Sequence, residues 1–151
     1  MRLLNKLIST FLLLGNFPYA SGTIASIVTV IIWGFFIKSE LDTYFIFFFI
    51  FTFVFGLASV HFYLLETNDD DPSEVVIDEV AGQSIPLIYI SSLENLDLII
   101  ISFIAFRFFD ILKIYPINRI EKLKGTLGVM LDDIFAGVYA LLCVIIYSLF
   151  I

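Results

Sequence analysis

The residues of this sequence best suited to chemistry are acids embedded in long apolar segments. Asp78 and Glu79 stand between Val75-Val76-Ile77 and Val80-Ala81-Gly82, and Asp132-Asp133 borders another apolar stretch. In a membrane helix each charge costs about 2.5–3.5 kcal/mol on insertion scales, so such acids persist where they are paired, hydrated or bound to a cation. The pattern indicates a candidate cation site.

A second group of charges combines both signs. Arg107, Asp110 and Lys113 recur at a spacing of three residues, so they share one side of a helix. One interpretation is an internal ladder of ion pairs that lets a helix end lie in the membrane interface. The other is a phosphate-binding cation beside a metal-binding carboxylate.

Ordinary helix capping is the alternative for the acids. Asp71-Pro72-Ser73-Glu74 predicts a helix start. Glu74 and Asp78 would then share a helix face, and Asp78 would lie too deep for a cap. Asp132-Asp133, taken alone, reads as the capped start of the last span. That interpretation weakens because three separate helices would bring carboxylates to one face.

Clustered carboxylates suit a hard cation, and Mg²⁺ binds carboxylates together with substrate phosphate oxygens. Cys143 and His61 are the single residues of their types, which excludes a Cys- or His-based zinc site. We interpret both as structural. Gly22-Thr23 opens an apolar span, where free backbone N–H groups at a helix start could bind phosphate.

The composition places these helices in a bilayer. The chain has 151 residues, 60% of them hydrophobic, and a mean hydropathy of +1.03. A soluble domain of this size could not bury so much apolar surface. The net charge of −7 argues against a nucleic-acid partner. We expect one membrane-embedded domain, residues 1–151.

The expected fold is all-α, a polytopic helical bundle of about five spans behind an N-terminal amphipathic surface helix. Apolar residues from Leu3 to Phe11 recur at helical spacing and predict the surface helix. Pro86 should kink or shorten the third span. The expected spans are about 22–37, 43–65, 71–91, 96–115 and 132–151.

Lysine and arginine predict the orientation. They concentrate at residues 2–6 and 107–124, which the positive-inside rule assigns to the cytoplasmic face. Five spans then bring the loop before Asp78 to that same face. Both groups of carboxylates are therefore expected at the cytoplasmic surface.

Four segments, in this order, resemble the phosphatidylglycerophosphatase A family. They are NFPYASGTIAS (16–26), DPSEVVIDEVAGQ (71–83), FRFFDILKIYPINRIE (106–121) and GTLGVMLDDIFAGVYA (125–140). The chain departs from the usual pattern at Ser21 for Pro, Ala25 for Gly, Ile114-Tyr115 for Pro-Trp, and Thr126 for Gly. All the ionisable motif positions are present.

The resemblance implies a Mg²⁺-dependent phosphatase of the bacterial cytoplasmic membrane that converts phosphatidylglycerophosphate to phosphatidylglycerol and phosphate. It implies Mg²⁺ ligands, phosphate-binding residues and a residue that is a ligand or a base. The ligands are Asp78, Glu79, Asp110 and Asp133; the phosphate-binding residues are Arg107, Lys113, Arg119 and Thr23; the ligand or base is Asp132. The attacking group stays open between activated water and a carboxylate.

Two other function classes compete. A CDP-alcohol phosphotransferase also uses acidic clusters in a membrane, but its Asp-Gly…Ala-Arg…Gly…Asp…Asp spacing is not found in this sequence. A small cation or proton transporter would spread its acids across the bilayer depth. The expected gathering of acids on one side, near basic residues, favours a phosphate substrate.

Overall fold

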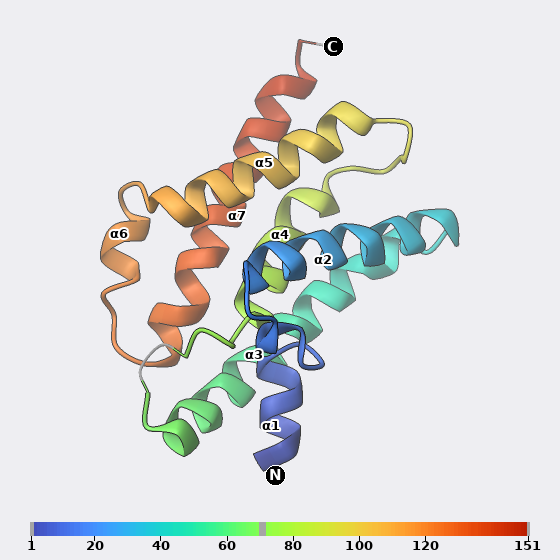
Figure 1. Cartoon of the computed structure of the whole chain (residues 1–151). Coiled ribbons are helices and arrows are strands. Elements are labelled where there is room, and N and C mark those ends of the chain that lie inside the picture. The colour runs from blue at the N-terminus through green and yellow to red at the C-terminus, as the bar shows by residue number, and fades with distance from the viewer. Residues whose placement is uncertain (1, 70–71, 151) are drawn as a thin grey trace.

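The computed structural model describes residues 2–69 and 72–150, and these residues form helices and connecting loops (Figure 1). The helices are α1 (Arg2–Ser9), α2 (Ser21–Lys38), α3 (Phe45–Thr67), α4 (Ile77–Ile88), α5 (Leu96–Leu112), α6 (Ile117–Ile120) and α7 (Thr126–Ser148). Short 3-10 turns lie at Leu14–Asn16 and Asp42–Tyr44. The prediction of an all-α fold is confirmed for the described residues.

Among the described residues, three helical segments are long and apolar enough to cross a membrane: Ser21–Lys38, Asp42–Thr67 and Thr126–Ser148. At a rise of about 1.5 Å per residue, the 23 residues of α7 extend roughly 35 Å, which exceeds the hydrocarbon core of a bilayer. Large apolar side chains such as Ile31, Phe35 and Phe47 are exposed on α2 and α3. Lipid is the solvent that suits such surfaces.

The expected count of five spans is not reproduced. Helix α4 has 12 residues and extends only about 18 Å, and the 17 residues of α5 extend about 26 Å. Pro86 lies in the last turn of α4, which ends two residues later, in agreement with the expected shortening.

The predicted start of the third span is wrong. Helix α4 begins at Ile77, and Asp71, the expected cap, lies outside the described residues. The chain before α4 instead packs against the end of α1, where the Val76 N–H donates to the Ser9 carbonyl oxygen over 3.0 Å. Glu74 therefore shares no helix face with Asp78. Its carboxylate accepts a hydrogen bond from the Tyr63 hydroxyl at 2.9 Å.

The five longer helices after α1 alternate in direction. One buried cluster joins the end of α2, the start of α3, the end of α4, the start of α5 and the end of α7. Its members on these helices are Trp33, Phe45, Leu87, Leu98 and Val144. A second cluster, which includes Ala25, Val60, Val80 and Met130, gathers the opposite ends of α2, α3, α4 and α7. Alternation therefore brings the first turn of α4 and the first half of α7 to one end of the bundle.

Helices α4 and α7 cross closely because glycines lie at the crossing. A Cβ added to Gly82 would lie 2.6 Å from the Asp133 carbonyl oxygen and 2.6 Å from the Phe106 ring. A Cβ on Gly137 would collide with the Gly82 carbonyl oxygen. Small residues allow such close approach of membrane helices. The expectation that Ala136 and Gly137 keep the last helix narrow agrees with this packing.

Helix α1 packs against the end of α3 that lies nearest the acids. The Asn5 amide donates to Glu66 over 3.2 Å, and the Ser9 and Ser59 hydroxyls are 3.2 Å apart. Leu3 and Leu4 point outward and are 69% and 59% exposed. The helix is shorter than expected, since it ends at Ser9 and Phe11 already has a positive φ of 41°. Its position on a membrane surface stays a prediction.

Candidate metal and phosphate site

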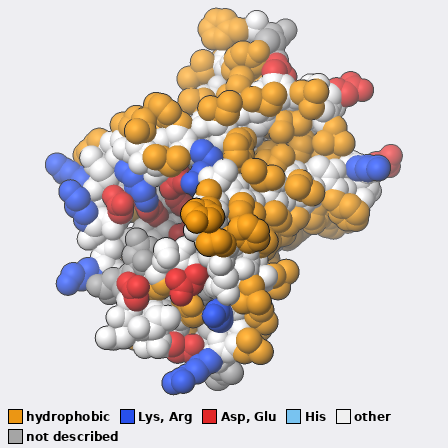
Figure 2. All heavy atoms as spheres, viewed as in Figure 1, with side chains coloured by type: hydrophobic (Ala, Val, Ile, Leu, Met, Phe, Trp, Pro, Cys, Tyr) orange, Lys and Arg blue, Asp and Glu red, His pale blue; other side chains and the backbone are white. Residues whose placement is uncertain are grey.

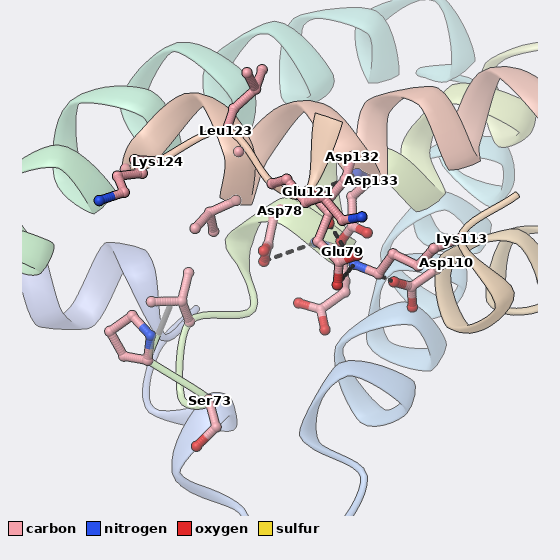
Figure 3. A pocket seen from close by; sticks show the side chains of 16 residues that line it. Ser73, Asp78, Glu79, Asp110, Lys113, Glu121, Leu123, Lys124, Asp132 and Asp133 are labelled. Atoms are coloured by element: carbon pink, nitrogen blue, oxygen red, sulfur yellow. Dashed lines mark hydrogen bonds and ion pairs between the residues drawn. The ribbon is translucent and has the colours of Figure 1, made fainter. Parts of the chain in front are cut away.

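Three carboxylates from two helices meet at one end of the bundle. Asp78 and Glu79 lie in the first turn of α4, and Asp133 lies in α7. One ligand oxygen from each lies within 4.8 Å of the others. Figure 3 shows the labelled acids converging on the same space. An all-oxygen donor set with this spacing fits a hard cation such as Mg²⁺.

Asp132 and Asp133 do not open the last helix, which corrects the predicted boundary. Helix α7 begins at Thr126, so both acids lie beyond its first turn. They are 6% and 3% exposed. The prediction placed the start of the helix at the charges of Asp132 and Asp133. The uncharged segment 127–131 instead continues the helix back toward Gly125. Capping therefore does not explain these two acids.

Asp110 and Asp132 form ion pairs with basic side chains. Arg107 lies 2.5 Å from Asp110, and Lys113 Nζ lies 2.5 Å from Asp132 and 3.9 Å from Asp110. Lys113 also approaches Glu121 at 3.7 Å. The expected ladder is therefore present, and it extends across helices from α5 to α7. The same contacts hold two cations next to the three clustered carboxylates.

Lys113 is firmly protonated at neutral pH. Burial on its own would lower the pKa of this side chain. The hydrogen bond and negative charge of Asp132, helped by Asp133 and Asp110, outweigh burial and raise the pKa above its usual value of 10.5. A permanent positive charge beside the carboxylates suits the binding of phosphate.

Several buried polar atoms near Glu79 have no hydrogen-bond partner among the described residues. They are Glu79 Oε2, Arg107 Nε and both amide atoms of Gln83, whose side chain is fully buried. Gly22, at the start of α2, packs directly against Glu79 and Arg107. Buried polar groups normally find a partner, so the unpartnered Glu79 oxygen is suited to binding a cation.

Gln83 was not predicted as a site residue, although the sequence carried a signal for it. It stands four residues after Glu79 in an apolar helix, which puts both side chains on one face.

A cavity of about 330 Å³ opens above the carboxylates. Its lining includes the predicted residues Asp78, Glu79, Asp110, Lys113, Asp132 and Asp133. It also includes residues that were not singled out, namely Ser73, Glu121, Lys122 and Lys124. Figure 2 shows charged side chains gathered around this hollow, while apolar side chains cover α5 and the outer part of α2.

Three predicted phosphate ligands do not line this cavity. Arg107 lies behind it, in contact with Asp110. Thr23 lies in the first turn of α2. Arg119 is exposed on α6, where its guanidinium sits 5.2 Å from the centre of the Tyr115 ring. His61 is exposed on α3, and Cys143 is half-buried in α7, in apolar surroundings.

Comparison with known proteins assigns the chain to a family. Residues 7–148 match phosphatidylglycerophosphatase A. The chain belongs to this family. The match includes every residue of the carboxylate site and all four segments that carry the resemblance, so the family prediction is confirmed. The family is named for a phosphomonoesterase.

Two curated relatives match part of the chain. A Haemophilus influenzae protein named "Phosphatidylglycerophosphatase A" is 44% identical over 75 residues, which are 49% of this chain and 45% of the relative. A Bacteroides thetaiotaomicron protein named "Putative phosphatidylinositol-3-phosphatase" is 41% identical over 76 residues, 50% of this chain and 48% of the relative. The chain spans about half the length of these relatives. No solved structure matches.

Proposed function

We propose that this protein is a Mg²⁺-dependent lipid phosphatase that hydrolyses phosphatidylglycerophosphate to phosphatidylglycerol and phosphate, within a single domain of residues 1–151. The observation that carries the proposal is the group Asp78, Glu79 and Asp133, whose oxygens lie within 4.8 Å of one another in a chain of this family. The neighbouring charge of Lys113 supports a phosphate substrate over a bare cation.

In this proposal Asp78, Glu79 and Asp133 hold the cation. When bound, Mg²⁺ would neutralise phosphate charge and polarise the phosphoryl group. Asp110 had been predicted as a further ligand, but its carboxylate is paired with Arg107 and Lys113. We assign it the role of orienting these two cations.

Lys113 is the phosphate-binding residue that the geometry supports best. It lines the cavity, and Asp132 holds its Nζ in place at 2.5 Å. Arg107 does not line the cavity, and it contributes to the site through its ion pair with Asp110. Thr23 and Arg119 lie outside the cavity lining, so we give them no direct contact with the phosphate.

The finer topology is also a proposal. The alternation of α2, α3, α4, α5 and α7 supports five crossings, with the short α4 extended by the chain that follows it. The basic residues of α1 and those around α6 lie at the site end, which supports a cytoplasmic site in a bacterial inner membrane. The carboxylates that face one another, Asp78, Glu79 and Asp133, lie at one end of the bundle, whereas a transporter would spread such acids across the bilayer depth.

The name of the Bacteroides relative supports a second substrate, phosphatidylinositol 3-phosphate. Both lipids carry a terminal phosphomonoester beyond a phosphodiester, so one site could accept either headgroup. Rates of phosphate release from the two lipids, measured side by side in the same micelles, separate the alternatives.

The test of the carboxylate site is Asp78→Asn, which preserves the shape of the side chain and removes its charge. Phosphate release should fall about 100-fold or more, because even outer-shell partners of a metal contribute about 10–100-fold. Asp42→Asn, an exposed acid at the opposite end of the bundle, is the matched control and should keep full activity. Full activity of a membrane-inserted Asp78→Asn variant would refute the assignment.

A further inference from the structure

Two lysines at the cavity make no ion pair with any acid in the part of the chain that the structure describes. Lys122 and Lys124 belong to the loop between α6 and α7, line the cavity and are exposed. Lys113 contacts three carboxylates, whereas neither of these two lysines makes an ion pair with any described residue. Figure 3 shows Lys124 set apart from the group of acids. The two ammonium groups are therefore available to a ligand.

The backbone of this loop is held against α7. The Leu123 carbonyl oxygen occupies the place where a side chain on Gly128 would begin, so only glycine permits the contact. Gly125 adopts a φ of 75°, which L side chains rarely adopt, and its carbonyl accepts the Gly128 N–H over 3.0 Å. The Leu123 N–H donates to the Ile120 carbonyl oxygen over 2.8 Å. These contacts hold the backbone that carries both lysines at the edge of the cavity.

Because many acids line the cavity, an anionic lipid needs basic side chains there that are not already paired with acids. The acids in its lining are Asp78, Glu79, Asp110, Glu121, Asp132 and Asp133. Lys113 shares its single charge among three of them and is assigned to the terminal phosphate in the proposed function. A divalent cation held by Asp78, Glu79 and Asp133 would coordinate one phosphate, but the three carboxylates already outweigh its charge. A second phosphate of the same headgroup needs other partners, and the two free lysines border the same space.

We propose that Lys122 and Lys124 form a subsite for the phosphodiester of the lipid, while the terminal phosphomonoester lies at the carboxylates. The proposal rests on the proposed function, because phosphatidylglycerophosphate carries both groups, separated by a glycerol unit. The subsite selects lipids whose phosphomonoester lies beyond a phosphodiester. It disfavours phosphatidic acid, whose only phosphate is the monoester itself.

The test compares the double variant Lys122→Gln/Lys124→Gln with the wild type in micelles of a neutral detergent. The KM for phosphatidylglycerophosphate should rise about tenfold, the effect of lost charged hydrogen bonds, while kcat changes less than about twofold. The matched control is Arg2→Gln/Lys6→Gln, which removes the same charge at the same end of the bundle, beside a different cavity. Its KM should not change.

An unchanged KM in the lysine variant overturns the subsite. An equal rise of KM in both double variants also overturns it, because that result indicates attraction to a charged surface. Binding of phosphatidylglycerol, which carries the diester alone, gives a readout independent of turnover. Its affinity in neutral micelles should fall about tenfold in the lysine variant only. If the wild type releases no phosphate, the proposed function fails, while this binding measurement still decides on the subsite.

Discussion

At the scale of single residues, the site separates into acids that face one another and acids that face cations. Asp78, Glu79 and Asp133 lie together, whereas Asp110 and Asp132 hold Arg107 and Lys113. The two sets differ in what they can bind. The first is suited to a metal ion, and the second positions positive charge for phosphate.

Lys113→Met should lower both stability and activity. The substitution leaves Asp132, which is 6% exposed, without its partner, so unfolding should become easier by about 1–3 kcal/mol. The folded-state pKa of Lys113 is raised, so its contribution is complete at neutral pH and is lost only as the pH rises beyond 10.5. The stability difference from wild type should therefore be constant between about pH 7 and pH 9.

Thermal unfolding in detergent at several pH values measures this difference, and phosphate release measures the activity. Lys38→Met, at the exposed end of α2, is the matched control and should change neither quantity. A stability difference that disappears between neutral pH and pH 9 would contradict a raised pKa for Lys113.

The sequence predicted the acids themselves but could not predict their partners. Charged residues in apolar segments were conspicuous by type, so all five acids were found. The pairing of Lys113 with Asp132 depends on how α5 and α7 are rotated against each other, and spacing along one helix does not contain that information. Lys122 and Lys124 counted toward the predicted orientation but not toward the site, because they stand in a loop without periodicity.

At the scale of helices, the crossing of α4 and α7 positions the carboxylates. Gly82 lies between Asp78 on its own helix and the backbone of Asp133 on the other. The distance between the two acids therefore depends on how closely these helices pack.

Gly82→Ala should push the two helices apart. The new Cβ would lie 2.6 Å from the Asp133 carbonyl oxygen, so the backbone must shift, at a cost of about 1–3 kcal/mol. We expect a lower unfolding temperature and a higher Mg²⁺ concentration for half-maximal phosphate release. Gly34→Ala is the control, because its nearest neighbour would be a Leu93 methyl at an ordinary 3.6 Å. An unaltered Gly82→Ala protein would show that the crossing does not position the site.

Helix boundaries were the weakest part of the sequence prediction. The start of α4 was set at Asp71 to Glu74 because those residues have good capping types, but the segment packs against α1 instead. The start of α7 was set at Asp132 because charge was taken to end an apolar span. The first error arises where a tertiary contact overrides local preference, and the second because the uncharged segment before Asp132 continues the helix.

At the scale of the whole molecule, the site end and the opposite end should face different compartments. A single cysteine at Arg119, which is exposed on α6, should be shielded from a membrane-impermeant maleimide in intact cells. One at Lys38 should react. Both are introduced after Cys143→Ser, which removes the natural thiol. Reaction of both cysteines from outside, or only of the one at residue 119, would contradict a cytoplasmic site.

The membrane character followed from composition alone, and the all-α fold followed from the length of the apolar stretches. Helix length and composition do not decide the number of spans, because α4 and α5 are apolar but shorter than the segments that suggested them, and five crossings stay a proposal. Pro86 and the packed loop before Ile77 account for the short α4.

The most direct test of the whole account is phosphate release from phosphatidylglycerophosphate by the purified protein, with Mg²⁺ and after its removal by a chelator. We expect release in the presence of Mg²⁺, loss of release in the chelator, and recovery when Mg²⁺ is restored. No release with Mg²⁺, or an equal rate in the chelator, would contradict it.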